Sequence, residues 1–280
     1  MRWHRERRSG NIDDRRVSRG PSAPAAVGLG GVGLLVVLLV ATVLGVDPTQ
    51  LLEATRPGGG ALEPHAAIQA DAMADFASQV LADTEDTWDR IFAERGQRYQ
   101  EPTLVLFTGA VQSACGFAEA AVGPFYCPGD QMLYLDLAFF EDLERQFAAP
   151  GDFAQAYVIA HEVGHHVQTL LGITQQVARL RSRQTQAEQN NTSVLVELQA
   201  DCFAGVWANR AQEMRLVLDA EDIEEGLRAA SAVGDDRIQH RTRGYVVPDS
   251  FTHGSSAQRV AWFRRGLESG DPNVCDTFGQ

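Results

Sequence analysis

Two histidines and a glutamate occur with the spacing H-E-x-x-H in the segment His161-Glu162-Val163-Gly164-His165. In an α-helix, residues four positions apart lie on one face, a single turn from each other. The imidazoles of His161 and His165 could therefore bind one metal ion, and Glu162 could reach a water molecule on that ion without being a ligand. This arrangement is typical of zinc hydrolases in which the glutamate is the general base. The alternative is an amphipathic helix that carries its histidines without a metal.

A catalytic zinc ion needs a third protein ligand and one open position for water. Glu197 is our candidate, because it follows His165 by enough residues for a second helix to return antiparallel to the first. Asp201 lies one turn further on the same face and could accept a hydrogen bond from the free ring nitrogen of a ligand histidine. An exposed acidic helix face would contain the same two carboxylates. The residues around them are almost all apolar, however, and carboxylates in so apolar a helix need partners.

The oxyanion of peptide hydrolysis usually needs a second donor beside the metal. The candidates all lie C-terminal to the proposed ligands, and they are His240, Tyr245, His253 and Arg259. His166 directly follows His165 and so points about 100° away around the helix. We therefore expect His166 to support the site or to pack in the core.

The elements on both sides of the motif are mostly helical. Asp152 is a plausible N-cap for the helix that carries the motif and that ends near Gly172. After it we expect a helix over 173–188, a polar loop around Asn190-Asn191-Thr192, a helix over 194–213 capped by Ser193, a helix over 220–233, a Gly/Asp-rich loop over 234–254, and a last helix from Ser255 or Ser256.

The residues before the motif predict a small sheet and another helix. We expect a long or broken amphipathic helix from Pro64 to about Gly96, buried strands over Pro102–Thr108 and Gln131–Leu137, and a short helix over 138–148. The predicted fold class is therefore α+β, a mostly helical zincin-like domain with a small sheet over 63–280. Met132–Leu137 is our candidate for an edge strand against which an extended substrate pairs.

An apolar segment near the N-terminus predicts a membrane anchor. Residues 27–46 contain no charged side chain, and seven arginines precede them. About 20 apolar residues span a bilayer, and basic flanks stay in the cytoplasm. We expect a basic cytoplasmic tail over 1–26, a single transmembrane helix over 27–46, a linker over 47–62, and a domain outside the cytoplasmic membrane. A cleaved signal peptide is the alternative, but no A-x-A site follows the run.

The four cysteines fit an oxidising compartment. Cys115, Cys127, Cys202 and Cys275 all lie on the side predicted to be exported, where disulfides persist. Three pairings are possible. We prefer Cys115 with Cys127, which closes a short loop, and Cys202 with Cys275, which ties the C-terminal tail to an interior helix.

The charge of the chain bears on its partners. The 280 residues have a formal net charge of −13, whereas phosphate binding needs a basic surface. We therefore expect a protein or peptide substrate and no nucleic acid partner.

Several segments resemble known metallopeptidases. H-E-x-x-H followed by E-x-x-A-D resembles the gluzincins, among them the HtpX-type membrane metallopeptidases. Nearly the whole chain resembles the bacterial neutral zinc metallopeptidase family (YpfJ-type). The segments that carry this resemblance are Met1-Arg2-Trp3, Val46-Asp47-Pro48, Ala160-His161-Glu162-Val163-Gly164-His165-His166-Val167-Gln168, Glu197-Leu198-Gln199-Ala200-Asp201-Cys202 and Val247-Pro248-Asp249-Ser250-Phe251-Thr252-His253-Gly254.

The resemblance implies a zinc peptidase with His161, His165 and Glu197 as ligands. In the HtpX-type metallopeptidases a T-H-P stretch, with an arginine downstream, lies near the active site. Thr252-His253-Gly254 and Arg259 are similar here, with glycine in place of proline. On this basis we select His253 as the second catalytic candidate beside Glu162.

The hypothesis from the sequence is a membrane-anchored zinc peptidase, most simply an endopeptidase that cleaves proteins. Cleavage of cell-wall peptide is a second enzymatic possibility. The alternative is a non-catalytic, zinc-stabilised binding or scaffold module of the envelope. The presence of Glu162 argues against this alternative, because a structural site needs a fourth ligand and no base.

Overall fold

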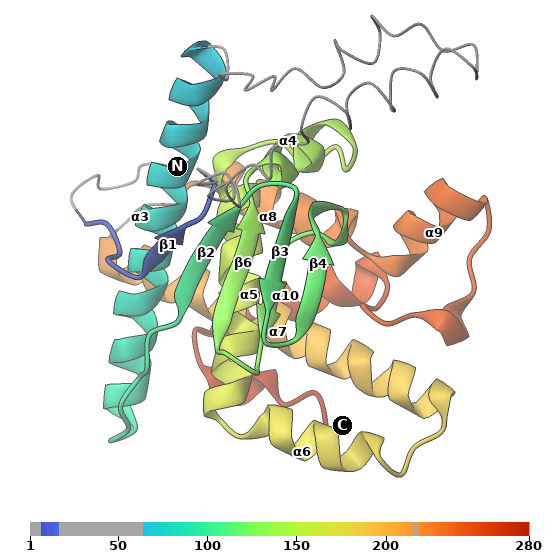
Figure 1. Cartoon of the computed structure of the whole chain (residues 1–280). Helices are drawn as coiled ribbons and strands as arrows, with labels where there is room; N and C mark the ends of the chain where they lie inside the picture. Colours follow the sequence, from blue (N-terminus) through green and yellow to red (C-terminus); the bar gives the residue numbers. More distant parts are fainter. Residues whose placement is uncertain (1–6, 17–63, 216–217, 280) are drawn as a thin grey trace, which may run out of the picture. The chain divides into compact units, whose positions relative to one another are not determined.

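The computed structural model describes residues 7–16, 64–215 and 218–279 (Figure 1). The described helices are α3 (Pro64–Glu94), α4 (Ala138–Arg145), α5 (Asp152–Leu170), α6 (Ile173–Arg181), α7 (Gln186–Arg215), α8 (Ala220–Ala232), α9 (Asp235–Arg243) and α10 (Ser256–Ser269). The strands are β1 (Ile12–Asp14), β2 (Thr103–Phe107), β3 (Ala110–Ser113), β4 (Gly116–Glu119), β5 (Phe125–Cys127) and β6 (Met132–Asp136). Short 3₁₀ turns occupy Ala120–Val122, Pro248–Ser250 and Pro272–Cys275. The fold is thus α+β and mostly helical, as predicted.

The main sheet has four strands in the order β1-β2-β6-β5. The strands β1, β2 and β6 are parallel, and β5 runs antiparallel to β6 with Tyr126 opposite Leu133. The strands β3 and β4 form a separate hairpin. The prediction that Met132–Leu137 is an edge strand is wrong, because β6 is hydrogen-bonded to β2 on one side and to β5 on the other. Among the described strands, β5 is the edge on that side of the sheet.

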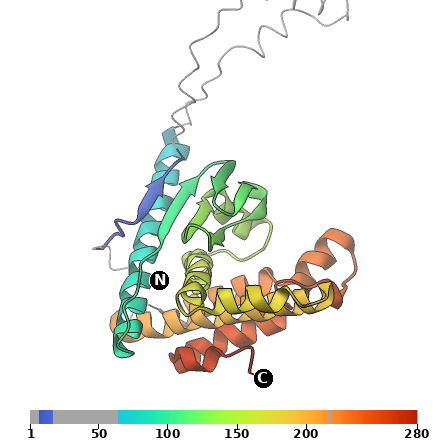
Figure 2. The ribbon, with the colours of Figure 1, turned by 60° about the horizontal axis from the view of Figure 1, so that its bottom comes forward.

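Apolar side chains determine which faces are buried. The strands β2 and β6 are almost continuously apolar, and Leu104, Leu106, Leu133 and Leu135 are each at most 2% exposed. They belong to one core with the buried face of α3 and with most of α5. Figure 2 shows the sheet on one side and the helices α5, α6, α7 and α10 together on the other. The helix α5 therefore lies between the sheet and the helices α6, α7 and α10.

Small residues allow the central helices to approach closely. A Cβ atom on Gly164 of α5 would lie 2.9 Å from the carbonyl oxygen of Ala200 on α7. A Cβ atom on Gly266 of α10 would lie 2.0 Å from the carbonyl oxygen of Cys202 on α7. Side chains larger than hydrogen at these two positions would force the helices apart. The helix α7 is therefore held between α5 and α10 at backbone contact.

Two predicted loops are helical in the structure. The loop expected around Asn190-Asn191-Thr192 lies inside α7, and the preceding helix ends at Arg181. A capping box begins α7: Glu188 accepts from the backbone nitrogen of Thr185 at 2.8 Å, and the Thr185 hydroxyl accepts from the Glu188 nitrogen at 3.5 Å. The loop expected over 234–254 contains α9, which ends at Arg243 and is followed by Gly244 with a left-handed φ of 77°.

The N-terminal segment differs from the prediction. Residues 12–14 form β1, which pairs with β2, and residues 7–16 belong to the same compact unit as the chain from Ala70 onward. Paired strands lie on one side of a membrane, so β1 cannot be across a membrane from β2. Residues 7–16 therefore belong to the folded unit and share its compartment. The cytoplasmic location predicted for residues 1–26 stays a prediction.

Side chains as well as backbone fix this segment. Glu85 on α3 is 1% exposed. It accepts hydrogen bonds from Ser9 at 2.5 Å, Asn11 at 2.9 Å and Arg7 at 3.0 Å. The predicted anchor over 27–46 and linker over 47–62 lie outside the described residues. Within the described ranges, no helix is both long and apolar enough to cross a membrane.

Both preferred disulfide pairings are confirmed. Cys115 is bonded to Cys127 and Cys202 to Cys275, with Cα–Cα distances of 5.8 and 5.6 Å. The second bond joins α7 to the C-terminal 3₁₀ turn across 73 residues of sequence. It holds this turn against the segment of α7 that carries Glu197 and Asp201.

Candidate metal centre

The helices α5 and α7 bring three potential metal ligands together. Ligand atoms of His161, His165 and Glu197 all lie within 4.8 Å of one another. The Nε2 atom of His161 is 3.2 Å from one Glu197 oxygen, and the Nε2 atom of His165 is 3.5 Å from the other. The contact between Gly164 and Ala200 lies between the two histidines on α5 and one turn from Glu197 on α7. This close approach of the helices is what allows Glu197 to reach both imidazoles.

Asp201 orients His161. The Nδ1 atom of His161 is 2.9 Å from Oδ1 of Asp201, which is fully buried. A carboxylate accepts at this position, so the Nδ1 atom carries a proton, and the Nε2 atom, which faces Glu197, is the one that could bind a metal ion. Asp201 therefore contacts the ring nitrogen of His161 that points away from Glu197.

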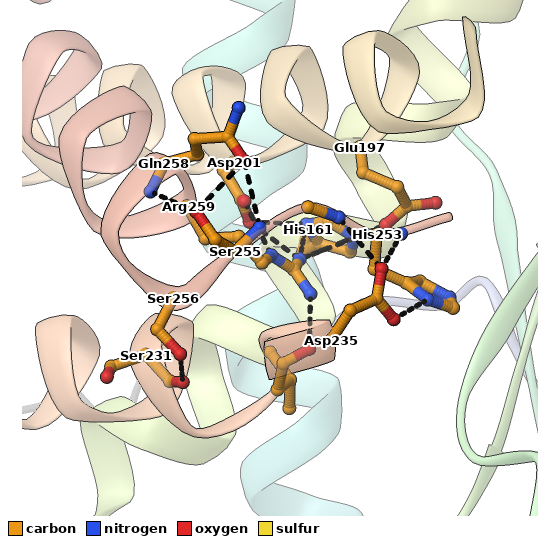
Figure 3. Close-up of polar contacts among 12 residues, drawn as sticks. His161, Glu197, Asp201, Ser231, Asp235, His253, Ser255, Ser256, Gln258 and Arg259 are labelled. Atoms are coloured by element: carbon orange, nitrogen blue, oxygen red, sulfur yellow. Dashed lines mark hydrogen bonds and ion pairs between the residues drawn. The ribbon is translucent and has the colours of Figure 1, made fainter. Parts of the chain in front are cut away.

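Arg259, which Figure 3 shows beside Asp201, and Tyr157 complete the environment of Asp201. Arg259 on α10 donates from Nε to one Asp201 oxygen at 2.7 Å and from Nη2 to the other at 2.9 Å. The hydroxyl of Tyr157, one turn before His161 on α5, donates to the same carboxylate. All three residues are at most 3% exposed. This network connects α5, α7 and α10 directly behind His161.

A second chain of hydrogen bonds orients His165. Its Nδ1 atom is 2.9 Å from the amide oxygen of Gln168. The Gln168 amide nitrogen donates to the carbonyl of Val196 at 2.7 Å and to Gln199 at 3.1 Å, and Gln199 donates to the carbonyl of Cys275 at 2.9 Å. Each amide can satisfy these contacts in a single orientation, so the Nδ1 atom of His165 donates to Gln168 and the Nε2 atom faces Glu197.

The electrostatics of the three residues favour a cation among them. Burial alone would lower the pKa of His161, but the carboxylates of Asp201 and Glu197 raise this pKa to about 10. Burial alone would raise the pKa of Glu197, but the charges of His165 and His161 hold it well below its usual value. The field that holds a proton on His161 would also stabilise a divalent metal ion that replaced the proton.

The donor set fits zinc. Catalytic zinc sites use two histidines and a glutamate among their ligand sets, and ligand atoms about 2.1 Å from a tetrahedral ion lie about 3.4 Å apart. The measured separations of 3.2 and 3.5 Å match this spacing. Both histidines present Nε2, and both have their Nδ1 atoms engaged by a second residue. The residues thus have the types, spacing and orientation that a zinc ion requires.

Comparisons with known proteins identify the family of the chain. A family model described as "Putative neutral zinc metallopeptidase" matches residues 1–278. The chain belongs to this family. It is 49% identical to "Uncharacterized protein YpfJ" of Escherichia coli (strain K12), and the match covers all of this chain and 99% of that protein. It is 44% identical to "Uncharacterized protein Rv2575" of Mycobacterium tuberculosis (strain ATCC 25618 / H37Rv), over 75% of this chain and 73% of that one. No solved structure matches the chain.

In this member of the family, the metal centre opens into a cleft of about 620 Å³. His161, Glu162, His165 and Glu197 all line it, and so does Tyr126 of the edge strand β5. Glu162 forms no hydrogen bond or ion pair with another described residue. Its carboxylate is therefore available to a molecule in the cleft. Most of the other lining side chains are apolar, including Phe125, Phe139, Phe147, Val177, Val196 and Ile238.

His253 also lines the cleft, in a loop shaped by Asp235. One Asp235 oxygen accepts from the backbone nitrogens of Thr252, His253 and Gly254 at 2.7, 2.6 and 3.1 Å. The other lies 3.2 Å from Nδ1 of His253 (Figure 3). This hydrogen bond raises the pKa of His253, which favours its protonated form.

Gly254 explains why the T-H-P pattern ends in glycine here. Its φ of +88° is in the left-handed region. Proline is restricted to φ near −65° and could not adopt it. A Cβ atom at this position would also lie 3.2 Å from Val194 on α7. The substitution is thus a consequence of how this loop turns toward α10.

The other sequence candidates lie elsewhere. His240 and Tyr245 are exposed on and after α9 and do not line the cleft. Arg259 borders the cleft, but its donors are engaged by Asp201, so it supports His161 instead of serving as a free oxyanion donor. His166 is buried on the opposite side of α5, 2.6 Å from the carbonyl of Gln100, and burial lowers its pKa. It packs in the core, one of the two roles expected for it.

Sequence reasoning missed four residues that support the site. Tyr157 and Gln168 are a helical turn before His161 and three residues after His165, so helix periodicity could have indicated both. Gln199 and Asp235 carry no comparable signal. Their partners, the carbonyl of Cys275 and the loop at His253, are distant in sequence or in irregular structure.

Proposed function

We propose that the chain is a zinc-dependent peptidase that hydrolyses internal peptide bonds of a protein or peptide substrate. The observation that carries this proposal is the position of the unpartnered Glu162 carboxylate in the same cleft as three converging metal-ligand side chains. A purely structural site would need a fourth protein ligand, and Asp201 is engaged behind His161 and not beside the donors. A bound zinc ion would act as a Lewis acid on the scissile carbonyl and would lower the pKa of an attacking water molecule.

Four residues of the chain would bind the metal ion and transfer protons. His161, His165 and Glu197 would hold the metal. Glu162 would accept a proton from the attacking water and then deliver a proton to the amine leaving group. Its position next to His161 places it beside the ligands while it makes no other contact that would compete.

His253 would stabilise the oxyanion that forms at the carbonyl. Its Nδ1 atom is directed to Asp235, so its Nε2 atom is available to the cleft. The raised pKa keeps the ring positively charged at higher pH than an ordinary histidine, which suits a donor to developing negative charge. Its exposed side chain, 51% accessible, can move toward a bound substrate.

The edge strand β5 would align the substrate. Phe125 and Tyr126 line the cleft. An extended peptide can add to the open side of an antiparallel edge strand through backbone hydrogen bonds. This role replaces the one predicted for Met132–Leu137.

We also propose that the folded unit works outside the cytoplasmic membrane. Two disulfides support this location, because such bonds persist in oxidising compartments. The pairing of β1 with β2 requires residues 12–14 to be in that same compartment, so it is not compatible with a single membrane crossing between residues 16 and 64. Labelling of single cysteines introduced at Asp14 and at an exposed position of α10, in intact cells, tests whether both are accessible from outside.

The first experiment is digestion of a degenerate peptide library by the full-length chain loaded with zinc, with mass spectrometry of the products. Glu162→Gln is the test variant and Glu268→Gln, on the exposed face of α10, is the matched control. We expect cleavage by wild type and by the control, and a loss of about 10²–10⁴-fold in the test variant at equal zinc content. Equal cleavage by Glu162→Gln would refute the assignment of the base. Tight zinc binding without cleavage by wild type would instead favour the scaffold alternative.

A further inference from the structure

One cationic side chain in the cleft has no anionic partner. Arg181, the last residue of α6, lines the cleft with the metal ligands. Within the described part of the chain, no carboxylate lies within ion-pair distance of Arg181. Its Nη2 atom donates to the hydroxyl of Ser193 at 2.6 Å, and its Nε atom is buried without an acceptor. A guanidinium that is partly buried and unpaired is unfavourable unless something else compensates the charge.

The position of Arg181 relative to the candidate metal centre is determined by its contact with Ser193 on α7. Ser193 is four residues before Glu197, so the two side chains lie on the same face, one turn and about 6 Å apart. The guanidinium of Arg181 is held at Ser193. It therefore lies roughly one helical turn along the cleft from a metal ligand. An extended peptide advances about 3.3 Å per residue, so a group near Arg181 belongs to a residue about two or three positions from the scissile bond.

The surroundings make this position selective. The other arginine that lines the cleft, Arg259, is neutralised by Asp201. The residues that precede Arg181 on the same face of α6, Val177 and Ala178, are apolar and also line the cleft. A charge-assisted hydrogen bond is stronger in such surroundings than in water. The Ser193 hydroxyl donates onward to the carbonyl of Gln189 at 3.0 Å, so Ser193 accepts from the guanidinium and orients it without neutralising it.

We propose that Arg181 is a specificity-determining residue that binds a substrate carboxylate two or three residues from the scissile bond. This inference rests on the proposed peptidase function. The carboxylate could belong to an aspartate or glutamate side chain or to the C-terminus of the substrate. In the first case the enzyme prefers acidic sites within a chain, and in the second it removes short C-terminal peptides.

Binding to the zinc-loaded, full-length Glu162→Gln variant tests the proposal without turnover. The probes are alanine–leucine heptapeptides that carry an uncharged fluorophore at the N-terminus. One set has an amidated C-terminus and a glutamate at each position in turn, with glutamine counterparts. The other has no glutamate and either a free or an amidated C-terminus. Fluorescence anisotropy gives the ratio of Kd values, carboxamide over carboxylate, for each pair.

We expect one pair to show a ratio of about 10–100, the range for a hydrogen bond to a charged group. Adding Arg181→Gln should bring this ratio close to one, Arg181→Lys should restore it in part, and Arg179→Gln, on the exposed face of α6, should leave it unchanged. The pair that responds identifies which carboxylate is bound. A ratio unaffected by Arg181→Gln, or no binding of any probe, overturns the proposal.

Cleavage by the wild type separates this inference from the peptidase assignment. If the wild type cleaves library peptides and the ratio does not depend on Arg181, the peptidase assignment stands and the specificity role fails. If the ratio depends on Arg181 but nothing is cleaved, the carboxylate site stands and the assignment of hydrolysis fails. A change in KM for carboxylate substrates, with kcat unchanged, would further mark binding as the step that Arg181 affects.

Discussion

Substitution of Asp201 by asparagine removes one charge and little volume from a fully buried position. The Asp201 carboxylate accepts four hydrogen bonds, two of them from Arg259, which is itself 3% exposed. Asparagine leaves the buried guanidinium with Glu197, 3.9 Å away, as its nearest remaining carboxylate among the described residues. Removal of one partner from a buried ion pair destabilises a protein by about 3–5 kcal/mol. We expect the metal-free protein to lose an amount in this range in urea unfolding.

The same substitution should weaken zinc binding. The asparagine amide can turn its nitrogen toward His161, and the ring is then no longer held with Nδ1 protonated and Nε2 free. Loss of such a supporting contact reduces metal affinity by about 10–100-fold. Competition with a chromogenic chelator at pH 7 measures this affinity.

Asp83→Asn provides the control that separates the two effects. Asp83 is 4% exposed and accepts a hydrogen bond from Trp207, away from the ligands. This variant should lose stability and keep its zinc affinity. If Asp201→Asn bound zinc within twofold of the wild type, the idea that Asp201 orients His161 would be refuted, whatever the change in stability.

Three further changes test other parts of the structure. Gly164→Ala places a methyl group against the Ala200 carbonyl, so it should lower the free energy of unfolding in urea by about 1–3 kcal/mol and weaken zinc affinity. Unchanged zinc affinity would contradict the idea that the close contact of α5 and α7 brings the ligands together. Asp235→Asn removes the carboxylate that raises the pKa of His253. Because His253 would act as a donor only when protonated, the alkaline fall in kcat/KM should move to lower pH, and a profile that did not move would exclude His253 as the oxyanion donor. Deletion of residues 1–16 removes β1 and the partners of Glu85, so it should lower the free energy of unfolding by about 1–3 kcal/mol; an unaltered urea midpoint would show that β1 does not contribute.

Helix periodicity explains why part of the site is predictable. The ligands His161 and His165 are four residues apart in one helix, and Glu197 and Asp201 are four apart in another. Each pair can be assigned to one helix face without knowledge of the rest of the fold. The apolar residues around Glu197 add that this face is buried. Together these local patterns place four residues at one site.

Long-range contacts explain what the sequence did not reveal. Arg259 follows Asp201 by 58 residues and lies on a different helix. The strand β1 lies in an arginine-rich segment with little apolar character, and it is held by backbone pairing with β2 and by polar bonds to Glu85, more than 70 residues away. The strand β5 has three residues next to Pro124 and Pro128, too few for an alternating pattern. None of these features leaves a signal in neighbouring residues.

The start of α7 shows a different kind of error. The polar run around Asn190 favours a loop, yet Thr185 and Glu188 form a capping box that begins the helix earlier. Thr192 is then 3% exposed and hydrogen-bonded to Gln184. Average polarity was misleading here, whereas the specific spacing T-x-x-E was informative. The longer helix matters for the proposed function, because it includes Ser193, the hydrogen-bond partner of Arg181.

The buried network of Asp201, Arg259 and Tyr157 is not required for stability as such. Replacement of a buried ion pair by apolar residues of similar volume is often neutral or stabilising. We therefore expect the combination Asp201→Leu, Arg259→Met and Tyr157→Phe to restore the metal-free free energy of unfolding to within about 1 kcal/mol of wild type. Its zinc affinity should remain as low as that of Asp201→Asn, because nothing fixes the ring of His161. If zinc affinity returned together with stability, the network would be a packing device, and the orientation of His161 would have to come from the helix alone.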